Sequence, residues 1–319
     1  MRENSYPEAG HPALPAFQAL ARETRAWLLV GSLTVKVDDA PASSEQGPAE
    51  RGAGPRLRDA TAEPAISASV IPAPCASPGS DPKGNPLPPC DAPRLRDAKV
   101  RESGAAPLSA GAASVSGVTS PEGAPVPPSD GARMANRSYL LSADGDIAAH
   151  YDKIHMFDVT LPSGKVIRES SAYRPGDRAV IAATPWGPLG MTVCYDLRFP
   201  HLYRALAQAG AIFLAVPSSF QRETGVAHWH TLLRARAIEN LSYVFAPAMC
   251  GEHPGNRTTY GHSLMIDPWG KILAELGGEP GVAIADINTD EVVRVRAMLP
   301  SLEHDRAFSL PPAGVSDNT

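Results

Sequence analysis

The chain has 319 residues, enough for one large or two ordinary domains, and its hydrophobic content of 43% allows a sizeable core. A formal net charge of −5 without a basic run argues against nucleic acid or an anionic membrane surface as the main partner. No segment reaches the roughly 20 apolar residues of a transmembrane helix, and residues 1–8 lack the apolar stretch of a secretion signal. The four cysteines have neither a disulfide-framework nor a zinc-site spacing, so we expect a reduced, cytoplasmic protein without a metal site.

The first 37 residues contain a predicted helix and a predicted strand. Apolar residues recur at helical spacing over residues 14–24, and residues 26–31 form a short apolar run typical of a buried strand. These two elements would belong to the same domain as the second half of the chain.

Residues 38–133 differ in composition from the rest. They hold 17 of the 33 prolines, are rich in Ala, Gly and Ser, and contain no aromatic residue. Because such a segment cannot bury enough apolar surface to offset its ordering entropy, we predict a disordered insert. The hexapeptide Pro-Arg-Leu-Arg-Asp-Ala occurs twice, at residues 55–60 and 93–98, which indicates local duplication within low-complexity sequence. Residues 1–37 and 134–319 would then form one interrupted domain.

Beyond the insert, strands and helices alternate irregularly. Asp144-Gly145 predicts a hairpin, since glycine tolerates a positive φ. An apolar strand follows and ends at Cys194, and the next helix begins at Pro200 and stops at Gly210. Further strands are expected at residues 211–216, 243–249, 263–266, 271–275 and 282–287, with helices at 228–240 and after a capping box of Asn288 and Glu291. This order favours α/β layers over mixed sheets rather than a purely parallel wound sheet.

Cys194 is the most informative single residue. A thiol between a buried strand and a helix N-terminus lies where backbone N–H groups and the helix dipole favour a thiolate. A lone cysteine on an apolar strand is more often an inert core residue, but the flanking sequence favours a nucleophile. Thiolate attack on an amide also needs a cation near the developing oxyanion and a carboxylate that moves protons, and Lys153 and Glu169 are the candidates.

Several motifs in the right order make the chain similar to the nitrilase, or carbon–nitrogen hydrolase, superfamily. They are Tyr151-Asp-Lys-Ile-His-Met-Phe-Asp158, Arg168-Glu-Ser with Pro175-Gly176, Val193-Cys-Tyr-Asp-Leu-Arg-Phe-Pro200, Pro217-Ser-Ser-Phe220, His228-Trp229 before Leu232 to Asn240, and Tyr260-Gly-His-Ser263 before Asp267-Pro-Trp-Gly270. The resemblance covers residues 12–37 and 134–308. It is strongest to the Nit subgroup, whose members are amidases of deaminated glutathione or of 2-oxo acid ω-amides.

This resemblance implies a four-layer α-β-β-α sandwich that hydrolyses a non-peptide carbon–nitrogen bond without a cofactor, in a homodimer or larger homo-oligomer. Cys194 would be the nucleophile and would form a thioester. Lys153 would stabilise the oxyanion together with the backbone N–H of Tyr195, while Glu169 would hold Lys153 and orient the substrate. Four residues are expected at or near the pocket rim, where a packing role stays equally open: Ser219, Phe220, His228 and Tyr260.

Arg198 is expected to pair with Asp196 or to meet a substrate carboxylate, and the structural role is favoured. A metal hydrolase built on His228 and His230 is disfavoured, because residues two apart do not share a helix face.

The superfamily's general base, a glutamate at the end of the second strand, has no match here. Only 25 residues precede Ala26, and neither Glu3 nor Glu8 follows an apolar run. We therefore expect a domain without its first strands and with an unpaired sheet edge. A second hypothesis stays open beside the amidase: a catalytically impaired remnant, or a binding protein on the same fold.

Overall fold

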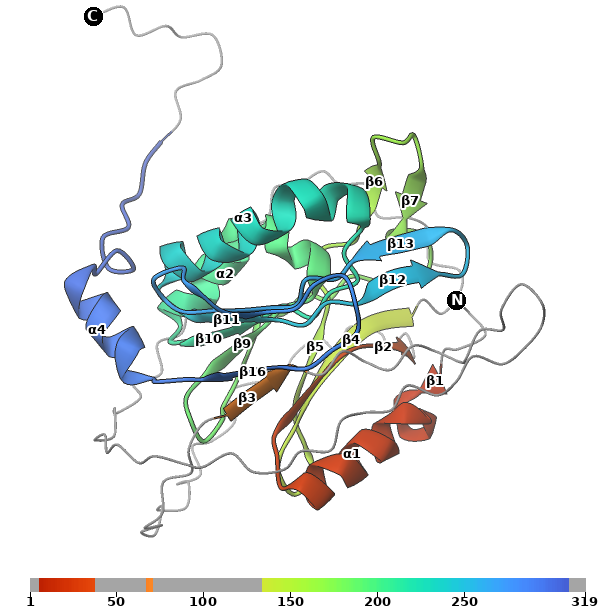
Figure 1. The fold of residues 1–319 in the computed structure, drawn as a ribbon, viewed down its shortest axis with the longest axis horizontal. Coiled ribbons are helices and arrows are strands. Elements are labelled where there is room, and N and C mark those ends of the chain that lie inside the picture. Colours follow the sequence, from red (N-terminus) through yellow and green to blue (C-terminus); the bar gives the residue numbers. More distant parts are fainter. Residues whose placement is uncertain (1–5, 38–66, 71–133, 310–319) are drawn as a thin grey trace, which may run out of the picture.

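The structure is a computed structural model that describes residues 6–37, 67–70 and 134–309, and only the backbone of 67–70 (Figure 1). One four-stranded sheet has the order β1-β2-β4-β5. Its strands are β1 (Tyr6–Pro7), β2 (Leu28–Lys36), β4 (Met134–Leu141) and β5 (Ile147–Asp152). β1 is parallel to β2, whereas the other neighbours are antiparallel, and helix α1 (Ala13–Thr24) covers the outer face (Figure 1).

A six-stranded sheet faces the first and has the order β15-β14-β11-β10-β9-β8. Its strands are β8 (Val180–Ala182), β9 (Leu189–Met191), β10 (Phe213–Ala215), β11 (Tyr243–Ala246), β14 (Leu264–Ile266) and β15 (Ile272–Glu275). The central strands β9, β10 and β11 are parallel, and the outer pairs are antiparallel, so the prediction of mixed sheets is confirmed. Helices α2 (Pro200–Gln208) and α3 (Arg222–Asn240) cover its outer face (Figure 1).

Three apolar clusters hold the layers together. Leu14 and Ala21 of α1 pack on Val30 and Tyr139 of the first sheet. Between the sheets lies a second cluster, to which Leu140, Tyr151, Met191, Phe213 and Tyr243 belong. A third cluster joins α2 and α3 to the six-stranded sheet and contains Leu206, Trp229, Leu233, Leu214 and Val244. The order is therefore helix, sheet, sheet, helices, which confirms the four-layer α-β-β-α sandwich.

Smaller elements surround this frame. Two antiparallel ribbons are formed by β6 (Asp158–Thr160) with β7 (Val166–Arg168) and by β12 (Cys250–His253) with β13 (Arg257–Tyr260). β16 (Ala283–Asp286) pairs with β3 (Ser67–Val70), and α4 (Asp290–Met298) follows. β3 lies within the predicted insert, and the remainder of 38–133 falls outside the described residues, so the disordered insert stays a prediction. None of the described helices is both long and apolar enough to cross a membrane.

Several predicted elements are present with changed bounds. The hairpin at Asp144-Gly145 joins β4 to β5, with a φ of 80° at Gly145. Helix α3 begins at Arg222, before the predicted start, and includes Gly225, where a Cβ atom would lie 2.4 Å from the Tyr260 ring. The small residue is therefore required by packing and does not interrupt the helix.

One expectation is wrong. The capping box does not form: the Asn288 side chain accepts a hydrogen bond from the Asp290 N–H at 3.0 Å, but Glu291 turns to Arg294 at 2.6 Å because the guanidinium offers a stronger partner. Glu8 follows only the two-residue strand β1, and its carboxylate accepts hydrogen bonds from Arg137 and from the Tyr139 hydroxyl. The carboxylate of Glu8 is thus engaged on the first sheet.

Candidate active site

Cys194 lies on a tight turn beyond the end of β9. Its φ of 52° is in the left-handed region, which is unfavourable for a residue with a Cβ atom and is found most often at functional sites. The Cys194 N–H donates to the Pro217 carbonyl at 3.0 Å, and a 3₁₀ turn (Cys194–Arg198) leads into α2. The side chain is half-buried, and the backbone N–H of Ser219 points at the sulfur, where it favours the thiolate.

Asp196 fixes this turn. Its side chain is fully buried and accepts hydrogen bonds from the Val193 N–H at 2.9 Å and the Tyr151 hydroxyl at 2.8 Å. The other carboxylate oxygen accepts the His155 N–H at 3.0 Å and lies 2.7 Å from His155 Nδ1. Because these partners occupy both oxygens, Asp196 does not pair with Arg198, and that expectation is wrong.

Lys153 and Glu169 form a buried ion pair next to the turn. Lys153 Nζ lies 2.5 Å from Glu169 Oε2, and the side chains are only 3% and 12% exposed. The same carboxylate accepts the Phe157 N–H at 2.6 Å and the Asn136 side-chain amide at 2.9 Å. A buried ion pair is tolerated only when such further hydrogen bonds compensate its desolvation. Glu169 therefore holds Lys153, as expected, while the contacts of Asn136 and Phe157 were not predicted.

The charges around Cys194 act in opposite directions. Burial raises the pKa of the thiol, the Lys153 ammonium lowers it, and the Glu169 carboxylate raises it again, so that the pKa lies above the ordinary value. The thiol is thus not ionised by its surroundings at neutral pH. Attack on a carbonyl consequently needs a group that removes the proton.

Arg198 lies over the aromatic side of the turn. Its guanidinium carbon is 5.3 Å from the Phe220 ring centroid and 5.9 Å from that of Tyr195, and Nη1 lies 3.3 Å from His228 Nδ1. Burial lowers the pKa of Arg198. Within the described part of the chain, no carboxylate forms an ion pair with Arg198, so this half-buried cation is available to an anion.

The four predicted rim residues differ in position. Phe220 and His228 contact Arg198, and Ser219 contacts the thiol through its N–H. Ser219 Oγ is buried and has no hydrogen-bond partner among the residues described. Tyr260 donates its N–H to the Phe220 carbonyl, and its ring packs against Gly225 and His262.

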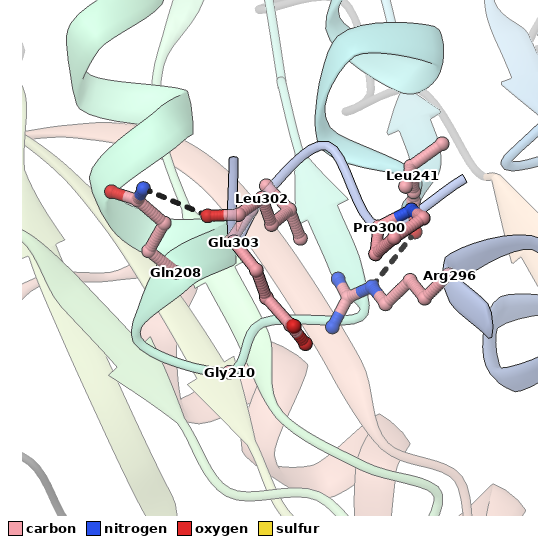
Figure 2. Close-up of a pocket in the computed structure, with 8 residues that line it drawn as sticks. Gln208, Gly210, Leu241, Arg296, Pro300, Leu302 and Glu303 are labelled. Atoms are coloured by element: carbon pink, nitrogen blue, oxygen red, sulfur yellow. Dashed lines mark hydrogen bonds between the residues drawn. The ribbon is translucent and has the colours of Figure 1, made fainter. Parts of the chain in front are cut away.

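A cavity of about 380 Å³ lies elsewhere, between α2, the end of α3 and the segment after α4 (Figure 2). It contains Arg296, whose pKa burial lowers to about 10. Figure 2 shows the Arg296 guanidinium directed at the Leu241 backbone, and it also bonds the Ala211 carbonyl at 2.7 Å. None of the predicted site residues lines this cavity, and its one arginine is engaged by backbone carbonyls.

Comparison with known proteins gives concordant matches. Residues 110–297 match the family model described as carbon-nitrogen hydrolase. A deaminated glutathione amidase of Synechocystis sp. is 47% identical over 171 residues, 53% of this chain and 63% of that protein. The human deaminated glutathione amidase is 45% identical over 172 residues, 54% of this chain and 53% of that protein.

Among solved structures, the NitFhit protein of C. elegans matches with a TM-score of 0.52 and 40% identity, covering 55% of this chain and 42% of that one. The chain thus spans less than two thirds of the length of the relatives it matches.

Proposed function

This chain belongs to the carbon–nitrogen hydrolase family, and from that premise we propose that it is an amidase of small non-peptide amides acting through Cys194. The observation that carries the proposal is the convergence of a thiol on a left-handed turn with the buried Lys153–Glu169 pair. Deaminated glutathione amidases at 45% and 47% identity support the amide class.

In the proposed reaction, Sγ of Cys194 attacks the amide carbon while the thiol proton passes to a base, which returns the proton to the amide nitrogen as the C–N bond breaks. The Lys153 ammonium and the Tyr195 N–H would stabilise the tetrahedral oxyanion, which collapses with cleavage of the C–N bond and loss of ammonia. Water then attacks the thioester and releases a carboxylic acid and the thiol.

Proton removal is the demanding step, because the pKa of Cys194 is raised while Glu169 and Asp196 are both engaged in hydrogen bonds.

An amide that also carries a carboxylate fits this surface best. Arg198 offers a half-buried cation that no carboxylate pairs with among the described residues. The carboxylate of such a substrate would accept hydrogen bonds from this guanidinium. We therefore propose a 2-oxo acid ω-amide or deaminated glutathione as the substrate class.

Ammonia release and intact protein mass test the proposal together. Incubation of the full chain with 2-oxoglutaramate or deaminated glutathione is expected to release ammonia and to give an acyl adduct on Cys194. Cys250→Ser serves as the matched thiol control, and Cys194→Ala should abolish both signals. A selective adduct on Cys194 without ammonia release would favour the impaired remnant. The absence of both the adduct and ammonia release would refute the amidase.

A homo-oligomer is also proposed, with a second copy on the outer side of α3. Ile238 of this helix is 44% exposed, and Trp269 is 54% exposed in the turn between β14 and β15, whose Gly270 packs against Ile238. Exposed apolar residues that lie together often mark an interface. Light scattering of the wild type and of Trp269→Ser would show a dimer and a monomer, respectively.

A thiol nucleophile works only when reduced, which supports the cytoplasmic location expected from the sequence.

A further inference from the structure

Two imidazoles and a carboxylate gather outside the candidate active site. His230 comes from α3, His262 from the segment before β14, and Glu275 from the end of β15. His230 Nε2 lies 2.9 Å and His262 Nδ1 lies 3.2 Å from Glu275 Oε1. The three potential ligand atoms all lie within 4.8 Å of one another.

The surrounding backbone fixes the position of His262. Its φ of 56° is left-handed, its N–H donates to the Gly277 carbonyl at 3.0 Å, and its carbonyl accepts the Trp229 indole N–H at 2.7 Å. These contacts hold His262 on both sides of its Cα atom. Such support is what a preorganised binding site requires of its ligands.

Tyr260 orients both imidazoles. Its ring stacks on that of His262 with centroids 4.2 Å apart and an interplanar angle of 24°. It also meets the His230 ring edge-on at 6.0 Å and 82°.

We propose that His230, His262 and Glu275 form a binding site for a divalent transition metal, with Zn²⁺ as the preferred ion. Two imidazole nitrogens and a carboxylate oxygen are a common zinc ligand set, and water completes the tetrahedron. Ligands about 2.0–2.1 Å from zinc lie roughly 3.2–3.5 Å apart in a tetrahedron. The two measured separations, 2.9 and 3.2 Å, need only a small opening of the cluster to reach that spacing.

Access and placement also suit an ion. The side chains of His230, His262 and Glu275 are 32%, 28% and 37% exposed, so solvent can deliver the metal and supply the fourth ligand. The ion would tie helix α3 to the segment before β14 and to β15, which carry the ligands. Binding is therefore expected to stabilise the fold, because a ligand that binds only the folded state raises its stability.

The test uses the full chain after removal of metals with a chelator. Titration with Zn²⁺ against a chromophoric competitor is expected to give one site with micromolar or tighter affinity, and a rise in Tm. Co²⁺ loaded instead should give the visible absorption of tetrahedral N/O coordination without a thiolate charge-transfer band. That band separates this site from binding at any cysteine.

Glu275→Gln and His230→Gln are each expected to weaken Zn²⁺ binding more than about tenfold, since each removes one ligand of the set. The matched control is His304→Gln, an exposed histidine outside the cluster. Circular dichroism and Tm in chelator verify that each variant folds. Absence of saturable binding, unchanged affinity in both variants, or a thiolate band in the cobalt spectrum would overturn the proposal.

Discussion

The two sheets of the sandwich differ in how completely they are built. The six-stranded sheet is covered by α2 and α3 and carries Cys194 on the turn after its strand β9. The four-stranded sheet ends at β1, which pairs only with Val35 and Lys36 of β2. On that side, the rest of β2 has no partner within the described residues. Lys153 directly follows β5 of the four-stranded sheet, so the candidate site depends on the less complete sheet for its cation.

Among the variants that test how the two sheets build the site, Lys153→Met would give the largest effect. It removes the cation expected at the oxyanion and leaves the Glu169 carboxylate buried without its partner. Turnover is expected to fall by about 10²–10³-fold from the lost oxyanion contact, and the free energy of unfolding by about 3–5 kcal/mol from the broken pair. Steady-state kinetics and urea unfolding measure the two. If turnover is unchanged in a folded variant, Lys153 has no catalytic role.

Arg198→Met probes the six-stranded side alone. Loss of the guanidinium should raise KM about 10- to 100-fold for amides bearing a carboxylate, since a hydrogen bond to a charged group contributes about 1.5–3 kcal/mol. Neutral short amides should show no change in KM. Equal effects on both substrate types would contradict the assignment of Arg198 to the substrate carboxylate.

Tyr151→Phe would test the connection between the two sheets. The Tyr151 hydroxyl on β5 donates to Asp196, on the turn of the other sheet, at 2.8 Å. Removing it should lower the free energy of unfolding by about 1.5–3 kcal/mol, because the acceptor is a buried carboxylate. Tyr173→Phe removes the 2.8 Å contact with Thr34 and is the matched control on the first sheet alone. A larger loss of unfolding free energy in Tyr173→Phe than in Tyr151→Phe would mean that contacts other than the Tyr151–Asp196 hydrogen bond couple the sheets.

The pH dependence of alkylation gives the smallest of these effects. Because the pKa of Cys194 is raised, its reaction with iodoacetamide should reach half-maximal rate at a higher pH than that of an ordinary cysteine. The sign for stability follows: the unfolded thiol ionises first, so this group contributes stability below its unfolded pKa and loses it as pH rises through the folded pKa. Mass spectrometry of the Cys194 peptide measures the midpoint. A midpoint below that of a model thiol would contradict the argument.

Local pattern predicted the frame well, since α1, the hairpin at Gly145 and the strand leading to Cys194 depend on near neighbours in sequence. The identity of Cys194 and Lys153 as candidates came from motifs, and in the structure the Lys153 ammonium lowers the pKa of the Cys194 thiol.

Contacts that depend on distant segments were missed. Asn136 reaches Glu169 only because β4 lies beside the turn that carries the glutamate, and no spacing rule reveals this. His230 was considered with His228, its neighbour in sequence, whereas its actual neighbour is His262 on another element.

The left-handed backbone at Cys194 determines which substitutions this turn tolerates. The penalty of that conformation belongs to any side chain with a Cβ atom, roughly 1–2 kcal/mol, and glycine alone escapes it. Alanine at this position would therefore carry the same backbone strain as cysteine. Removing the sulfur in this way should leave the conformation of the turn unchanged, so the variant is expected to bind an amide without hydrolysing it.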